Sequence, residues 1–308
     1  MTAAFARRSP AAIALALGTV YLVWGSTYLA IRITDRTMPP LLMSSARFLL
    51  AGAVLFALTA RGHRPTLREW RAAAIVGATL LAVGNAGIAW AETRIDSGSA
   101  ALIVAVIPLY VALFDRVFFG RRLSPVAVAG LLLGFGGVAL LVGPGGSNIG
   151  TALALLATTS AWAGGSLYAR GAPLPRNPLL SASMQMLCAS VLLGVAGLAG
   201  GEAGAVHAQG FGAEPLLAFG YLVVVGSVLA FSAYAWLLKN VRISVVATYA
   251  FVNPIVAVAL GAVFLGEPIT APTLAAGAAI VLAVVLIVVG KLPARRPKLS
   301  VQPATLTP

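Results

Sequence analysis

The fold of this chain is decided by residues 90–143, WAETRIDSGSAALIVAVIPLYVALFDRVFFGRRLSPVAVAGLLLGFGGVALLVG, because the chain repeats them in outline at 236–290. The second copy is WLLKNVRISVVATYAFVNPIVAVALGAVFLGEPITAPTLAAGAAIVLAVVLIVVG. Three landmark pairs keep one offset of 146 (236 − 90, 254 − 108 and 266 − 120): Trp90 with Trp236, Pro108 with Pro254, and Gly120 with Gly266. Three coincidences in register, inside matching apolar runs, indicate a duplicated unit.

The composition indicates a membrane protein. The chain is 60% hydrophobic and 9% charged, with a mean hydropathy of +0.97, whereas about 25% of the residues of a soluble domain are charged. Apolar runs of about 20 residues, each long enough to cross a bilayer core, predict ten spanning helices at about 11–31, 40–60, 72–91, 97–114, 124–143, 149–169, 178–199, 215–237, 243–265 and 270–290.

The net charge of +13 suggests a nucleic-acid partner, but the positions of the charges argue against one. Most Arg and Lys residues fall in one set of alternate loops, and only Arg32, Arg36 and Arg94 fall in the other set. Because cytoplasmic loops carry an excess of Arg and Lys, both termini are predicted to be cytoplasmic. We therefore expect a lipid bilayer around the protein and no nucleic acid.

Five spans in each copy make the repeat inverted. An odd number of spans forces the second copy to enter the membrane from the opposite side, as in many secondary transporters. The duplication extends to the first spans, where Trp162 follows Trp24 and Pro178 follows Pro40 by 138 residues (162 − 24 and 178 − 40). The fold prediction is all-α, with ten helices as two inverted repeats at 11–143 and 149–290, after a segment at 1–10 and before a basic tail at 291–308.

The sequence contains no recognisable catalytic set. Both histidines lie in predicted loops, and the single cysteine, Cys188, can form neither an intrachain disulfide nor a metal site alone. We predict no enzyme activity, no metal and no cofactor. The acidic residues are placed at loop ends rather than at mid-membrane, so facilitated transport, or coupling through other groups, is expected. Glu92, at the end of the third run, is the nearest candidate for coupling.

Several polar and aromatic residues within the apolar runs are candidates for a substrate cavity. A buried arginine is costly in a bilayer, so Arg47 either faces a partner or cavity or extends outward toward Asp35. Trp90 and Trp236, at helix ends, could equally belong to an interfacial belt. The predicted cavity residues are Trp24, Tyr28, Arg47, Asn85, Trp90, Trp162, Gln185, Tyr249 and Asn253, with hinges at Pro108 and Pro254.

Four segments resemble a known family. WGSTYLAIR at 24–32, SARFLLAG at 45–52, SGSAALIVAVIPLYVALF at 97–114 and YAFVNPIVAVALGAVFLGEPIT at 249–270 are similar to EamA-type transporters of the drug/metabolite transporter superfamily, most like its YedA-like bacterial exporters. Arg121 stands where the second copy has Glu267, so the turn of the first copy departs from the family pattern.

The resemblance implies a multi-pass protein of the bacterial inner membrane with a central cavity. It also implies efflux of amino acids or related small metabolites and drugs, with the two repeats alternating access to a midplane site. Two alternatives remain at this point: a lipid or sugar-conjugate carrier of the same fold, or a non-transporting membrane subunit or sensor. The expected partners are a small-molecule substrate and lipid, and the protein is expected to be a monomer or a homodimer.

Overall fold

The computed structural model describes residues 9–61, 63–120, 123–143, 148–206, 211–241, 243–246 and 248–289, and for residues 235, 238, 239, 243, 244, 251, 288 and 289 only the backbone. Every regular element within these residues is helical. The predicted tail at 291–308, Arg121 and most of the segment at 1–10 lie outside the described residues.

The first half of the chain contains the elements α1 (Pro10–Asp35), α2 (Pro40–Thr59), α3 (Leu67–Val76), η1 (Gly77–Asn85), α4 (Ala86–Glu92), α5 (Ser97–Val104), α6 (Ile107–Phe119) and α7 (Pro125–Val142). The second half contains α8 (Ile149–Ala169), α9 (Pro178–Ala199), η2 (Glu202–Ala205), α10 (Ala213–Tyr221), η4 (Leu222–Leu229), α11 (Ala230–Asn240), α12 (Ile243–Val246), α13 (Tyr249–Leu265) and α14 (Ala271–Val289). Prolines open α1, α2, α7 and α9, a position where the missing N–H costs no hydrogen bond.

Seven of the described helices are long and apolar enough to cross a membrane: 10–35, 40–59, 67–92, 97–119, 125–142, 178–199 and 213–234. Two shorter apolar helices, Val252–Leu265 and Ala271–Ile287, accompany them. The helix α8 is 21 residues long but is not among the seven, since its Gly, Ser and Thr residues lower its mean hydropathy. The all-helical membrane class is confirmed, and the count of ten spans stays a prediction.

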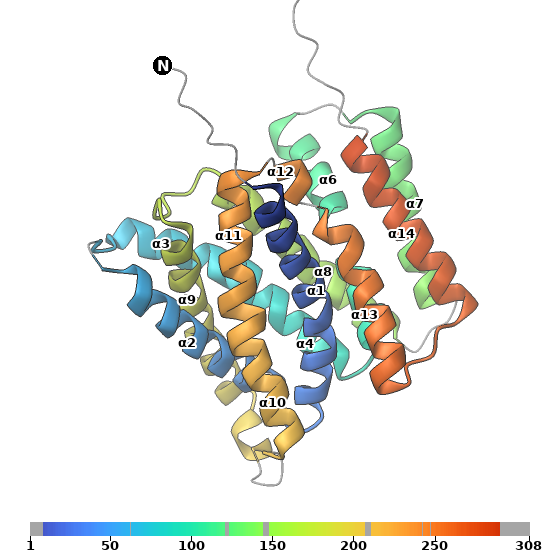
Figure 1. Cartoon of the computed structure of the whole chain (residues 1–308). Helices are drawn as coiled ribbons and strands as arrows, with labels where there is room; N and C mark the ends of the chain where they lie inside the picture. Colours follow the sequence, from blue (N-terminus) through green and yellow to red (C-terminus); the bar gives the residue numbers. More distant parts are fainter. Residues whose placement is uncertain are drawn as a thin grey trace, which may run out of the picture.

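The two halves interlock through equivalent helices. The helix α2 packs against its counterpart α9 on one side of the bundle, and α7 packs against its counterpart α14 on the other (Figure 1). Between these pairs, α1 contacts α13 and α11, and correspondingly α8 contacts α6 and η1. Helices of both halves therefore pack together in one bundle. The space between α1, α8 and their neighbours lies at its centre.

The helix α1 runs from one end of the bundle to the other, and its first and last residues name these two ends. We call the end where α1 begins at Pro10 and α14 finishes at Val289 the terminal end (Figure 1). The opposite end, where α1 finishes at Asp35 and α4 finishes at Glu92, is called the acidic end.

The two predicted hinge prolines have different surroundings. A turn at residues 105–106, whose backbone stays in the right-handed region, separates α5 from α6, so Pro108 lies at the start of α6 directly after this break. Pro254 lies inside the continuous helix α13, and the break in the second half comes earlier, before Tyr249. The trailing glycines behave alike: Gly120 and Gly266 end α6 and α13 with φ of 63° and 66°, a left-handed conformation that favours glycine.

Wide π-helical turns occur at matching places in the two halves, a feature that the sequence did not predict. The stretch η1 continues α3 into α4, and η4 continues α10 into α11. Their first residues, Gly77 and Leu222, are 145 apart (222 − 77), close to the repeat offset. The π turn η1 contacts α8, and η4 contacts α1, so both lie beside the central space. Such turns are frequent at functional sites.

Candidate functional site

A cavity of about 80 Å³ lies at the centre of the bundle, where both halves contribute walls. Seven of the nine predicted cavity residues line it: Trp24, Tyr28, Arg47, Asn85, Trp162, Tyr249 and Asn253. The remaining lining residues are Thr27, Ile31, Ile88, Val104, Ile107 and Phe231. The wall is thus largely aromatic and aliphatic with a few polar groups, the usual composition of a small-molecule site.

Arg47 supplies the positive charge of the cavity. Its side chain is 4% exposed, and its Nε donates a hydrogen bond of 2.9 Å to Oγ of Ser227 in η4. The guanidinium also lies 5.2 Å from the ring centre of Phe48. No carboxylate pairs with Arg47 among the residues that the structure describes. Of the two orientations considered for Arg47, the structure has the one that faces the cavity.

Trp24 forms an aromatic wall with three rings from the second half. Its ring centre lies 5.2 Å from that of Phe231, 5.0 Å from that of Tyr234 and 5.2 Å from that of Tyr249. Such spacings are those of favourable edge-to-face and tilted contacts. The adjacent Gly25 lets α1 approach α13 closely, because a Cβ there would lie 2.6 Å from Cβ of Val256.

The first half contributes an equivalent wall around Trp162. The ring of Trp162 packs over Gly84, where a Cβ would come within 2.5 Å of the ring. The following residue, Asn85, ends η1 and lines the cavity. Trp24 and Trp162 therefore both line the cavity and pack on the other half, Trp162 against the π turn η1 and Trp24 against rings of α11 and α13.

Hydrogen bonds and apolar packing close the cavity toward the terminal end. The hydroxyl of Tyr21 is hydrogen-bonded to Oγ1 of Thr248. Val20, Leu237 and Val246 form a buried cluster against which Trp24 packs. With its amide oriented so that nitrogen donates, Asn253 bonds the carbonyl oxygens of Tyr21 and Tyr249 at 3.2 and 3.0 Å. Asn253 therefore joins α1 to α13 as well as lining the cavity.

Two predicted cavity residues lie elsewhere. Trp90 is 36% exposed, and its ring stacks with Arg94 at 4.0 Å, so it does not line the cavity. This placement suits an interfacial tryptophan. Gln185 bonds Ser181 at 2.9 Å within α9, and its backbone packs on Gly77. Small residues permit such close helix contacts, which explains the position of Gln185.

Glu92 lies at a helix end, the last residue of α4, but it is enclosed by the rest of the protein. Its side chain is 0% exposed, and both carboxylate oxygens have no hydrogen-bond partner among the described residues. The sequence could not show this, because the covering residues come from distant parts of the chain. Glu92 is not a lining residue of the cavity.

Two of the cavity residues that were not predicted, Phe231 and Thr27, carry a signal in the sequence. Phe231 follows Asn85 by the repeat offset of 146 (231 − 85), and both line the cavity. Thr27 lies within the WGSTY segment on the same helix as Trp24. The aliphatic lining residues carry no such signal, since they are indistinguishable from other core residues in an apolar helix.

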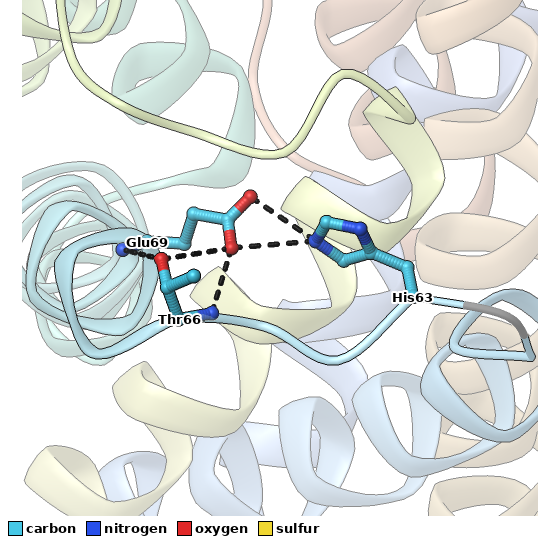
Figure 2. Close-up of polar contacts among 3 residues, drawn as sticks. All are labelled: His63, Thr66 and Glu69. Atoms are coloured by element: carbon cyan, nitrogen blue, oxygen red, sulfur yellow. Dashed lines mark hydrogen bonds and ion pairs between the residues drawn. The ribbon is translucent and has the colours of Figure 1, made fainter.

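A second hollow lies at the surface, between the α2–α3 and α8–α9 connections. Its polar contacts are local: Thr66 caps α3 reciprocally with Glu69, and His63 contacts Glu69 at 3.1 Å (Figure 2). This is a capping box, which stabilises a helix start. His63 is 46% exposed, in agreement with its prediction as a loop residue.

Known proteins resemble this chain in both sequence and fold. The sequence pattern of the EamA-like transporter family matches residues 11–143 and 148–289. The chain is 40% identical over 284 residues to the "Uncharacterized inner membrane transporter YedA" of Escherichia coli (strain K12), covering 90% of each chain. It is 26% identical over 280 residues to the "Probable terminal-alkyne amino-acid exporter" of Streptantibioticus cattleyicolor, covering 89% of this chain and 92% of that one. A solved crystal structure with 22% identity superposes with a TM-score of 0.61 over 90% of this chain and 96% of its own, which supports the fold.

Proposed function

This chain belongs to the EamA-like transporter family, and from that premise we propose that it exports amino acids or related small metabolites. It is a multi-pass transporter of the bacterial inner membrane, and such a protein acts on a small molecule within a lipid environment. Amino-acid export is the activity named for one relative, and the composition of the cavity supports a similar cargo here.

The observation that carries the proposal is the buried charge of Arg47, with which no carboxylate of the described residues pairs. A buried cation without an acidic partner is costly, and a carboxylate on the cargo would offset that cost. Arginine binds carboxylates through two parallel N–H donors. Because Nε is bonded to Ser227, the remaining nitrogens are the donors for cargo. The aromatic wall around Trp24 would then contact the amino end or side chain.

The cavity size favours a small cargo over a lipid or a sugar conjugate. A volume of about 80 Å³ is well below the roughly 300–1,000 Å³ of sites for drug-sized ligands. It corresponds to a few water molecules at about 30 Å³ each, so even an amino acid requires the walls to move apart. Movement at Pro108 and at the break before Tyr249 would supply this opening.

The proposal is tested by comparing amino acids with their amides. Purified protein in proteoliposomes would be assayed by counterflow for each standard amino acid and for its amide derivative. Arg47→Gln should raise KM for the free amino acids by about tenfold or more, the cost of one charge-assisted hydrogen bond. It should leave transport of the amides nearly unchanged. Arg94→Gln, which removes a charge stacked on Trp90 outside the cavity, is the matched control.

A separate result would contradict the proposal. If Arg47→Gln, folded and present at wild-type levels, transports free amino acids with an unchanged KM, Arg47 does not bind the carboxylate. Transport of a lipid or of a sugar conjugate, with no counterflow of any amino acid, would favour the carrier of larger cargo instead.

We also propose ten spans in two inverted repeats, with both termini cytoplasmic. The described arginines concentrate in the connections of one side and in the helix ends next to them, namely Arg61, Arg64, Arg68, Arg71, Arg116, Arg170 and Arg176. The positive-inside rule places these in the cytoplasm. In a Cys188→Ala background, Arg176→Cys should react with an impermeant thiol reagent only after the membrane is opened. Arg94→Cys should react in intact cells, and the reverse pattern would invert the topology.

A further inference from the structure

Two carboxylates at the acidic end have buried oxygens that make no hydrogen bond. Both oxygens of Glu92 and both oxygens of Asp35 are enclosed without a partner among the described residues. Glu92 is 0% exposed and ranks among the most completely buried side chains of the described chain. An ionised carboxylate in this environment is strongly unfavourable, and such a group neutralises by binding a proton.

The surrounding charges do not supply a compensating partner. Asp35 and Glu267 repel a negative charge on Glu92, and Arg32 attracts it. Asp35 is in turn attracted by Arg32 and repelled by Glu202. Arg32 makes no ion pair with either acid in the described residues. Nearby in the α4–α5 turn, the pKa of Asp96 is raised by burial first and then by Glu267, against the effect of Arg32.

The other acids nearby already have structural roles. Glu267 accepts hydrogen bonds from the backbone N–H and hydroxyl of Ser97, both at 2.9 Å, and from the N–H of Gly98 at 3.2 Å. Glu202 similarly accepts from the N–H groups of Leu41 and Leu42 at the start of α2. Both are helix caps with satisfied oxygens, whereas Glu92 and Asp35 cap nothing.

Tyr28 connects this acidic pair to the cavity. It lines the cavity and is also close enough to Glu92 to interact with it electrostatically. Asp35 lies further along the same helix, at the last residue of α1. Cavity, Tyr28, Glu92 and Asp35 therefore follow one another from the centre of the bundle to its acidic end.

We propose that Glu92 and Asp35 form a proton-binding site, separate from the cargo cavity, that couples proton entry to cargo export. This inference rests on the proposed function, since coupling requires transport. A proton arriving at the acidic end binds the carboxylate of Glu92 and gives the neutral acid. When the bundle opens at the terminal end, the acid releases the proton past Tyr28 into the cavity and the carboxylate is restored.

The coupling follows from the cost of burying a charge. The closed bundle encloses Glu92 completely, so this arrangement suits the protonated pair. Loss of the proton leaves an unpaired buried charge and favours an arrangement that exposes Glu92 to water or to a cation. Proton binding and release therefore shift the bundle between its two arrangements, as a ligand with different affinities for two states must.

The first test detects the proton without any cargo. Infrared difference spectra of the protein in nanodiscs would be recorded over a pH titration to follow the carbonyl band of a protonated carboxylic acid. Wild-type protein should show this band at neutral pH, and Glu92→Gln should lose the part that Glu92 contributes, leaving only the part that Asp35 contributes. Asp35→Asn should change the pH at which the band disappears, because the negative charge with the largest effect on Glu92 is removed. Glu214→Gln, at an exposed acid of α10, should leave the band unchanged.

The second test measures coupling in proteoliposomes loaded with a mixture of the standard amino acids and a pH-sensitive dye. External acidification should drive proton entry and amino-acid release in wild-type protein and in Glu214→Gln. Glu92→Gln should retain amino-acid counterflow but show no proton entry above that of protein-free vesicles. If Glu92→Gln does not fold, Asp35→Asn is used in both tests. The pH at which the infrared band disappears and the pH dependence of proton entry should then both differ from those of wild-type protein.

Three outcomes would overturn the proposal: a neutral-pH band that Glu92→Gln leaves undiminished, proton entry that persists in that variant, or dependence of transport on a sodium gradient. The infrared result does not depend on cargo. Failure of amino-acid transport is therefore distinguishable from failure of proton binding.

Discussion

Arg47 of α2 and Ser227 of η4 are joined by a hydrogen bond of 2.9 Å from Nε to Oγ across the boundary between the two repeats. Both side chains are buried. Ser227 lies in a π turn, and Gly226 beside it lies next to the guanidinium, since a Cβ there would be in van der Waals contact, at 3.4 Å, with a terminal nitrogen of Arg47. The second repeat thus orients the charged group of the first toward the cavity.

Ser227→Ala is expected to weaken cargo binding through Arg47. Loss of one hydrogen bond to a charged group costs about 1.5–3 kcal/mol, so KM for free amino acids should rise about tenfold or more while kcat changes less. Ser232→Ala removes a hydroxyl that bonds its own helix at 2.6 Å and serves as the control. An equal effect of both variants would exclude a specific orienting role, and proteoliposome kinetics would decide.

Trp24→Ala is expected to impair transport while the protein still reaches the membrane. The change removes three ring contacts, each worth about 0.5–1.5 kcal/mol, and a loss of at least about tenfold in transport is expected. Trp90→Ala alters an exposed ring outside the cavity and should transport normally. Counterflow rates normalised to protein level would measure both, and normal transport by Trp24→Ala would remove Trp24 from the site.

Gly25→Ala is expected to destabilise the fold because α1 contacts α13 at this residue. The added methyl would lie 2.6 Å from Val256, and overpacking of this kind costs about 1–3 kcal/mol. Gly18→Ala, on the same helix with nothing within 4 Å of its Cβ position, should be neutral or slightly stabilising. Thermal unfolding in detergent compares them, and equal Tm values would show that the contact can relax.

Glu267→Ala is expected to loosen the turn after α13 from the start of α5. Three hydrogen bonds to Ser97 and Gly98 would be lost, and loss of a helix cap costs about 0.5–2 kcal/mol. A lower Tm is therefore expected, with Glu214→Ala unchanged. Glu267→Gln retains an acceptor oxygen and should recover part of the loss; a Tm of Glu267→Ala equal to wild type would show that the cap contributes little.

Much of the cavity was predictable because spanning helices penalise polar groups. Arg47, Asn85 and Asn253 are costly in lipid, and the repeat register connected Trp24 with Trp162, so their inward placement follows from sequence and solvent alone. The same argument was wrong about the location of Trp90 and Gln185, because a helix end and a local bond to Ser181 satisfy these side chains without a cavity.

The sequence by itself determined the membrane class, the duplicated helices and the helix starts at proline, because hydropathy and backbone chemistry are local properties. Only the tertiary structure decided that Asn85, at the end of the π turn η1, lines the cavity, that Ser227 orients Arg47, and that Glu92 and Asp35 are enclosed without hydrogen-bond partners among the described residues. These features depend on contacts between the two repeats, far apart in the chain, and a local pattern cannot show which distant helix covers a side chain.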